Sequence, residues 1–132
     1  MSQENIEIVR REAEARGARD WALLAEIWDP DIELELVAGS GTFKGPEEIR
    51  PFLETLSSLH SEYRVEVDEV IDAGERVVTA ERVAGRGLKG SDAGAWIEDR
   101  YFRVIAFRDG KVWRIKEYRT RDQALEAAGL RE

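Results

Sequence analysis

The residue types available for chemistry are restricted in this sequence. It contains no cysteine and one histidine, His60. The first fact excludes a cysteine nucleophile and a thiolate metal site, and a single histidine argues against an imidazole metal site. What remains is acid–base chemistry by carboxylates, with arginines as their partners. We therefore expect neither a metal nor another cofactor.

Length and charge define the class of protein. The 132 residues suffice for one domain with one hydrophobic core, so we expect residues 1–132 to form a single domain. The net charge of −8 argues against nucleic acid as a partner. The most apolar stretch, residues 21–28, is short and contains Glu26, which predicts neither a signal-peptide core nor a membrane span. We expect a soluble cytoplasmic protein that does not bind membranes.

Hydrophobic periodicity predicts helices first and strands last. Helical spacing indicates helices over residues 3–16, 21–28, 45–59 and 121–128. Alternation and turn signals indicate strands over residues 32–36, 42–44, 63–71, 76–85, 95–107 and 112–118. This order predicts an α+β fold, with helices packed on one face of a curled antiparallel sheet and a pocket at its open end.

Three further segments carry alternative interpretations. The Gly-rich loop 87–94 resembles a phosphate cradle, but no helix follows it, which favours a hairpin tip. The mixed charges of residues 10–16 are typical of a solvated helix face. Phe102, Val104, Ala106 and Val112 fall on the sheet face away from the helices, and such a patch predicts a homodimer through the open sheet face.

Five strings along the chain resemble one known group of proteins. They are Met-Ser-Gln-Glu-Asn at 1–5, Asp-Pro-Asp-Ile-Glu at 29–33, Phe-Lys-Gly-Pro-Glu-Glu-Ile at 43–49, Arg-Asp-Gly-Lys-Val at 108–112 and Ala-Leu-Glu-Ala-Ala-Gly-Leu at 124–130. Together they resemble the SnoaL-like group of the nuclear-transport-factor-2-like superfamily. This resemblance implies a cone-shaped, strongly curved antiparallel sheet wrapped around N-terminal helices, as in cystatin-like folds. Because the superfamily includes several kinds of enzyme and noncatalytic proteins, function must come from the site.

The implied cone places particular side chains in its pocket. With the Asp109-Gly110 hairpin as the anchor, residues 101, 103 and 105 of one strand and 113, 115 and 117 of the next face inward. The candidate ligand-binding residues are Trp28, Leu36, Tyr101, Ile105, Trp113 and Ile115.

The catalytic patterns of the superfamily match this chain unevenly. Ketosteroid isomerases use a carboxylate base, a tyrosine and a protonated aspartic acid. Leu36, Glu12 and Arg103 occupy these three positions here, in that order, which argues against steroid isomerisation. Limonene-epoxide hydrolases use two aspartates around an arginine. Arg82 matches their arginine, but Ala84 and Glu117 stand at the aspartate positions.

SnoaL-type polyketide cyclases resemble the chain in length and order of elements, and they use a carboxylate inside the cone. The resemblance therefore implies Glu117 as an acid–base residue, assisted by Arg82 and Arg103, acting on a small hydrophobic substrate in a cyclase, isomerase, dehydratase or hydrolase reaction. Two alternatives remain open. Glu117 can face solvent if its strand twists, and the arginines can form a purely structural network with Glu81 or Asp99. The chain would then be a noncatalytic dimeric binding or assembly module without an open active site.

Overall fold

The computed structural model describes residues 2–87 and 94–130 of the chain. Its elements, in chain order, are α1 (Ser2–Ala18), α2 (Trp21–Ile27), β1 (Trp28–Glu35), the 3-10 turn η1 (Val37–Gly39), β2 (Thr42–Lys44), α3 (Pro46–Ser58), β3 (His60–Ala73), β4 (Arg76–Gly87), β5 (Trp96–Arg108), β6 (Lys111–Tyr118) and α4 (Arg121–Ala127). The main differences from the predicted boundaries are the earlier starts of β1 and β3. The Gly-rich loop falls mostly at residues 88–93, outside the described residues.

The six strands form one sheet in the order β2-β1-β6-β5-β4-β3. Neighbouring strands are antiparallel except for β1 and β6, which are parallel. The prediction of a fully antiparallel sheet is therefore wrong at this one pair. A parallel pair requires a long connection between its strands, and here α3 and the β3–β5 strands supply it. Hairpin signals in the sequence report only on neighbouring strands, so they could not indicate this pairing.

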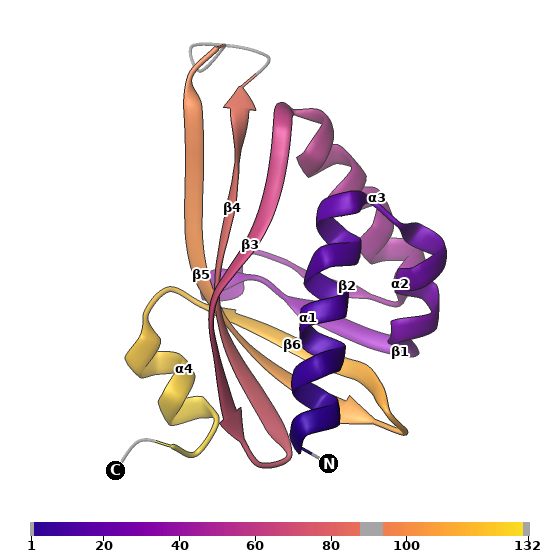
Figure 1. Ribbon diagram of the computed structural model, residues 1–132, viewed down its shortest axis with the longest axis vertical. Coiled ribbons are helices and arrows are strands. Elements are labelled where there is room, and N and C mark those ends of the chain that lie inside the picture. The colour runs from indigo at the N-terminus through magenta and orange to yellow at the C-terminus, as the bar shows by residue number, and fades with distance from the viewer. Residues whose placement is uncertain (1, 88–93, 131–132) are drawn as a thin grey trace.

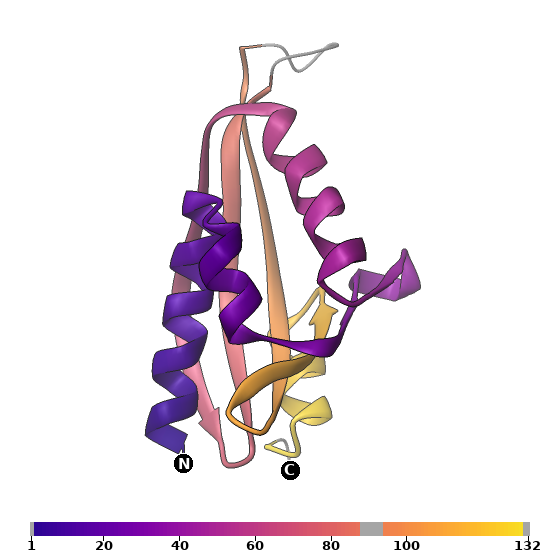
Figure 2. The ribbon, with the colours of Figure 1, turned by 90° about the vertical axis from the view of Figure 1, so that its right-hand side faces the viewer.

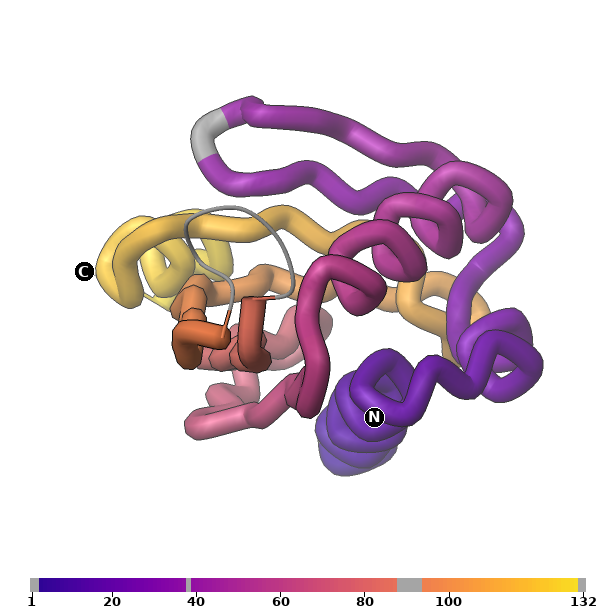
Figure 3. Tube along the Cα trace, turned by 90° about the horizontal axis from the view of Figure 1, so that it is seen from above, coloured from indigo at the N-terminus to yellow at the C-terminus, as the bar shows by residue number. Residues whose placement is uncertain are grey.

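The sheet is strongly curved, and helices α1, α2 and α3 lie on its concave side (Figures 1 and 2). Seen from above, the chain curls around these helices without closing (Figure 3). Helix α4 packs on the opposite face of the sheet, against β4, β5 and β6. The prediction that all helices cover one face is wrong for this helix.

Local sequence signals explain where the shorter helices begin. The Asp20 carboxylate accepts a hydrogen bond from the Leu23 amide and caps α2. Proline stands at the first position of α3, where its missing amide hydrogen costs no helical hydrogen bond. Thr120 and Gln123 form a reciprocal capping box at the start of α4.

The β5–β6 hairpin contains the irregularity that most affects the site. Asp109 and Gly110 both have positive φ angles, 51° and 74°, as a tight two-residue hairpin turn requires. Ala106 pairs with Arg114, but Phe107 pairs with Val112. Trp113 is therefore the extra residue of a β-bulge, which changes the alternation of side chains beyond it.

Two apolar clusters stabilise the sheet. The larger lies between the concave face and the first three helices, and its buried members are Val9, Ala15, Leu24, Ile27, Trp28, Ile32, Leu34, Ile49, Val77, Ile105, Val112 and Ile115. The smaller joins Val78 and Val104 to Ala124 of α4, with Phe102 packed at its edge. The apolar patch predicted on the open face is therefore largely covered, because α4 packs over Val104 and the bulge turns Val112 into the main core. None of the helices in the described residues has the length and apolarity to cross a membrane.

Candidate functional site

A cavity of about 340 Å³ lies between the concave face of the sheet and helix α3. Helix α3 supplies an apolar wall through Ile49, Phe52, Leu53 and Leu56, whose spacing of three, one and three residues places them on one face of the helix. The volume is at the lower end of the range for pockets that bind small organic molecules. The cavity therefore has the size and apolar lining of a small-ligand site.

The structure brings most, but not all, of the candidate residues to this cavity. Those that line it are Trp28, Leu36, Tyr101, Arg103, Ile115 and Glu117. Ile105 shares their face of β5 but is buried in the main core. Trp113 lies outside the cavity, with the guanidinium groups of Arg108 and Arg114 at 4.9 and 4.5 Å from its ring centroid. The prediction for Trp113 fails because the bulge interrupts the two-residue alternation that was counted from the hairpin.

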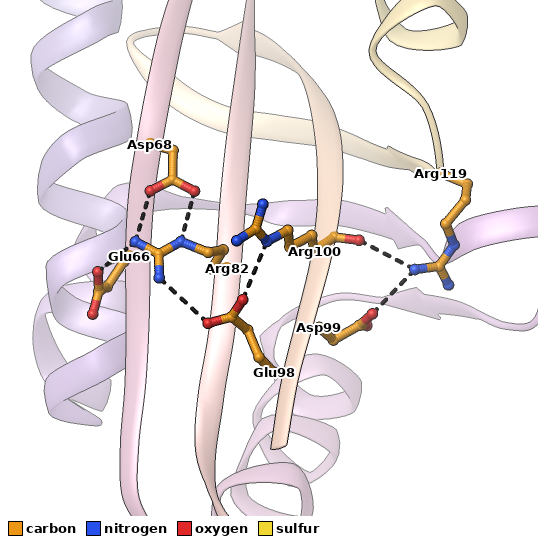
Figure 4. A network of polar contacts seen from close by, with 7 residues as sticks. All are labelled: Glu66, Asp68, Arg82, Glu98, Asp99, Arg100 and Arg119. Atoms are coloured by element: carbon orange, nitrogen blue, oxygen red, sulfur yellow. Dashed lines mark hydrogen bonds and ion pairs between the residues drawn. The ribbon is translucent and has the colours of Figure 1, made fainter. Parts of the chain in front are cut away.

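Arg82 points to the convex face and not into the cavity. Its guanidinium pairs with Glu66 at 2.8 Å, Asp68 at 2.7 Å and Glu98 at 3.4 Å (Figure 4). Hydrogen bonding from Arg82 lowers the pKa of the Asp68 carboxyl from its ordinary value. Arg82 precedes the cavity-lining Val83 and follows the buried Glu81, so strand alternation directs it outward. It belongs to a surface ion network and has no contact with the cavity.

Helix α1 contributes two buried charges that the sequence interpretation placed in solvent. Glu12 and Arg16 are 2% and 6% exposed. They continue the helical stripe of Val9 and Ala13, both of which are buried. The i, i+3, i+4 and i+7 spacing of these four residues was the available signal, and the charged character of positions 12 and 16 concealed it.

The two α1 residues belong to a buried network that joins the helix to the sheet. Arg16 Nε donates to Glu12 Oε1 at 2.8 Å, and Arg16 Nη2 donates to Glu81 Oε1 on β4 at 2.7 Å. Thr79 Oγ1 donates to the other Glu81 oxygen at 2.7 Å. The indole Nε1 of the cavity-lining Trp28 donates to Glu12 Oε2 at 3.0 Å. Each buried carboxylate therefore has partners on both oxygens, as a buried charge requires.

Arg103 connects this network to Glu117. Its Nη1 lies 3.3 Å from Glu12 Oε1 and 3.6 Å from Glu81 Oε2. Strand register places Arg103 directly opposite Glu117, and Arg103 Nε lies 3.9 Å from Glu117 Oε2. This distance is too long for a hydrogen bond. Arg103 Nε is buried and makes no hydrogen bond within the part of the chain that the structure describes.

The two carboxylates that face Arg103 from the sheet have opposite electrostatic environments. Burial raises the pKa of Glu81, but the attraction of Arg16 and Arg103 and two side-chain hydrogen bonds outweigh it and lower this pKa to about 2. Burial also raises the pKa of Glu117, and there Arg103 and Arg16 oppose it without outweighing it. Glu81 is thus a fixed anion, whereas Glu117 is a carboxyl group that keeps its proton to a higher pH than an ordinary glutamate does.

Additional polar residues line the cavity. Asp99 and Arg119 form an exposed ion pair of 3.1 Å at its rim, and Arg119 also donates to the Arg100 carbonyl (Figure 4). His60 and Tyr63 line the cavity from the start of β3. The His60 Nδ1 lies 3.0 Å from the Leu56 carbonyl oxygen, which can only accept, so Nδ1 carries the proton in this contact. Within the described residues, no group of three or more His, Asp or Glu side chains is arranged to hold a metal ion.

The family model of the SnoaL-like domain matches residues 9–115. The chain belongs to the SnoaL-like family. It is thereby a member of the nuclear-transport-factor-2-like superfamily. None of the curated proteins matches its sequence.

Solved structures similar to this SnoaL-like protein share its fold at low sequence identity. A candidate SnoaL-like polyketide cyclase from Jannaschia sp. has a TM-score of 0.75 and 21% identity, over 99% of this chain and 94% of that one. TerC, co-crystallised with polyporic acid, has a TM-score of 0.72 and 22% identity, over 96% and 98%. A protein from Catenulispora acidiphila with a ketosteroid isomerase-like fold, in complex with trimethylamine, has a TM-score of 0.72 and 18% identity, over 95% and 94%.

Proposed function

We propose that this SnoaL-like protein binds a small, mainly apolar carbonyl compound in the cavity and catalyses proton transfer at the carbon next to the carbonyl group. Glu117 is the acid–base residue. The observation that carries the proposal is the position of the Glu117 carboxyl, which lines an apolar cavity, is 13% exposed and lies 3.9 Å from the Arg103 guanidinium. A carboxylate in such surroundings has a raised pKa and is therefore a stronger base than a solvated one.

The proton transfer can be written with the groups at hand. The Glu117 carboxylate takes the α-proton, the electron pair of the C–H bond forms the C=C bond of an enolate, and the carbonyl π pair moves to oxygen. Arg103 stabilises the negative charge that develops on this oxygen, since its guanidinium is buried and held by Glu12 and Glu81. Glu117 then returns the proton to carbon or oxygen. Enolisation of this kind is the first step of isomerisation and of aldol cyclisation.

The relatives support a small organic ligand without identifying it. Two of the similar structures hold trimethylamine and polyporic acid, and another is a candidate polyketide cyclase. Arg82 has no role in this proposal because its side chain is held in the surface network. The noncatalytic alternative is a dimeric binding or assembly module without an open active site. The cavity of about 340 Å³ favours a ligand-binding protein over this alternative.

Hydrogen–deuterium exchange tests the reaction without knowledge of the natural substrate. The purified protein is incubated with β-tetralone in D₂O, and loss of the α-proton signals is followed by NMR. We expect exchange above the buffer rate, and we expect Glu117→Gln to reduce the protein-dependent rate about a hundredfold to ten-thousandfold. Glu75→Gln, in the exposed β3–β4 turn, is the matched control and should retain the wild-type rate. Full activity in Glu117→Gln would exclude Glu117 as the base.

A further inference from the structure

The charged groups around the cavity cancel one another. Arg16 and Arg103 face Glu12 and Glu81 in the buried network. At the rim, Arg119 pairs with Asp99. Apart from Glu117, the charged residues of the cavity and its network are therefore balanced among the described residues, and the cavity offers no net positive charge to an anionic ligand.

We infer that the ligand is an uncharged carbonyl compound whose oxygen lies beside Arg103, and that the cavity rejects carboxylates of the same shape. This inference rests on the proposed function and specifies its substrate class. A carboxylate ligand would lose its hydration inside the cavity, would gain no unpaired cation there and would face the Glu117 carboxylate. A neutral carbonyl group avoids both costs.

Arg103 supplies the donor that recognises such an oxygen. Its Nε is buried and makes no hydrogen bond in the described part of the chain, whereas its Nη1 contacts Glu12 and Glu81. Buried donors in proteins are normally paired. The Glu117 carboxyl lies 3.9 Å from Arg103 Nε and is not hydrogen-bonded to it. If this carboxyl rotates away, a carbonyl oxygen of the ligand can accept a hydrogen bond from the Nε–H group. The α-carbon of the same ligand then lies next to Glu117.

The position of Arg103 allows its guanidinium to stabilise the negative charge both before and after proton transfer. Before proton transfer, the negative charge resides on Glu117, opposite Arg103. After transfer, Glu117 is neutral and the charge is on the enolate oxygen beside the same guanidinium. The net charge of the buried site does not change during the step, which keeps the desolvation cost of the two states similar. An additional carboxylate on the ligand would add an uncompensated negative charge to the buried site in both states.

Three ring-matched probes test the inference by calorimetric titration at pH 8. They are β-tetralone, the hydrocarbon tetralin and tetralin-β-carboxylate. We expect the ketone to bind about tenfold more tightly than the hydrocarbon, as a hydrogen bond to a charged donor implies. We expect the carboxylate to bind more weakly than the ketone. Equal affinities for ketone and hydrocarbon, tighter binding of the carboxylate, or no binding of any probe would overturn the inference.

Two variants separate the role of the Arg103 Nε–H donor from that of the Glu117 negative charge. Arg103→Lys retains the positive charge but removes the guanidinium Nε, so we expect it to lose the preference for the ketone over tetralin. Arg100→Lys, exposed on the same strand, is its control. Glu117→Gln removes the negative charge that faces the ligand and should improve binding of the carboxylate while leaving tetralin unchanged. Because Glu117 is outside the Glu12–Arg16–Glu81 network, this second variant tests the charge argument even if Arg103→Lys does not fold.

The titration and the exchange experiment test two separate claims, the carbonyl subsite and the proton transfer, and each claim can be refuted without the other. Ketone preference without deuterium exchange would remove the proposed reaction and leave the carbonyl subsite in place. Deuterium exchange without ketone preference would support Glu117 as a base and overturn the role of Arg103 as the oxygen donor. Circular dichroism of each variant checks that the fold is retained.

Discussion

Glu117 shares the Arg103 guanidinium with two other carboxylates, Glu12 and Glu81, and its burial is the main determinant of how its charge depends on pH. Burial raises its pKa in the folded protein, so the folded state holds its proton to higher pH than the unfolded chain does. The stability that this proton contributes is fully present below the unfolded pKa of about 4.3 and is lost as pH rises through the raised folded pKa. The same titration produces the carboxylate that acts as base.

The raised pKa of Glu117 predicts how activity and stability change with pH. Protein-dependent deuterium exchange should increase with pH and level off above the raised pKa of Glu117, with a midpoint above that of an ordinary glutamate. Glu117→Gln should gain stability relative to the wild type between pH 4 and pH 8, because the amide has no proton to lose. Exchange rates and urea unfolding across this range measure both effects. A midpoint at or below the ordinary glutamate pKa would contradict the prediction.

Glu12 is predicted to act as a positioning residue for Glu117 through the arginines. Glu12→Gln retains a side-chain oxygen for Arg16 and Trp28 but removes one of the negative charges that neutralise Arg103 and Arg16. The less neutralised arginines should lower the pKa of Glu117, so the midpoint of the exchange–pH profile should move down and the plateau rate should fall. Glu14→Gln, exposed on the same helix, should leave the profile unchanged. A purely structural role would change the rate without moving the midpoint.

The close approach of β3 and β4 holds His60 at the cavity. A Cβ atom added to Gly85 would lie 2.7 Å from the His60 Cβ and 3.1 Å from the Ser61 carbonyl oxygen. Gly85→Ala should therefore displace the start of β3, lower the free energy of unfolding by about 1–3 kcal/mol and weaken ligand binding. Calorimetric titration and urea unfolding measure the two effects.

Gly17 near the end of α1 is the matched control for this prediction. A Cβ atom there would make ordinary contacts of 3.7 Å with Val65. Replacement of a helical glycine by alanine at a compatible position stabilises a protein by about 0.4–1 kcal/mol. If Gly85→Ala and Gly17→Ala had effects of the same sign, the close packing of β4 against His60 would not constrain the site.

Elements were predictable from the sequence where the signal is local. Helical stripes, capping residues and the Asp109-Gly110 turn indicate the helices and the β5–β6 hairpin, and two-residue alternation indicates that residues 101, 103, 115 and 117 share a face. The parallel β1–β6 pair depends on contacts between distant segments. The bulge at Trp113 depends on pairing register. Helical spacing places Glu12 and Arg16 on the buried face of α1, but the partners on β4 and β5 that make burial of their charges favourable cannot be found from the periodicity of one helix.

Helix α4 covers part of the convex face of the sheet, and this changes the argument for a dimer. The expected homodimer relied on an exposed apolar strip on the convex face. Val104 is 8% and Val112 1% exposed, and salt bridges cross from β1 to β6 on the same side, Glu33–Arg114 and Glu35–Lys116. Dimerisation through the sheet stays a prediction, but any interface there must include α4 or the charged strands beside it.

Helix α4 therefore acts as the cover of the convex face, and its removal should cause self-association. Ala124 is fully buried against Val78 and Val104, so Ala124→Glu would place a carboxylate among apolar side chains and should detach the helix. Detachment would expose the apolar side chains of Val78, Val104 and Phe102 together, and a contiguous apolar patch favours association. We expect light scattering to give a higher mass for Ala124→Glu than for the wild type at equal micromolar concentration. Ala127→Glu adds the same charge at an exposed position of this helix and should keep the wild-type mass. Equal masses for all three proteins would show that the strip does not drive association.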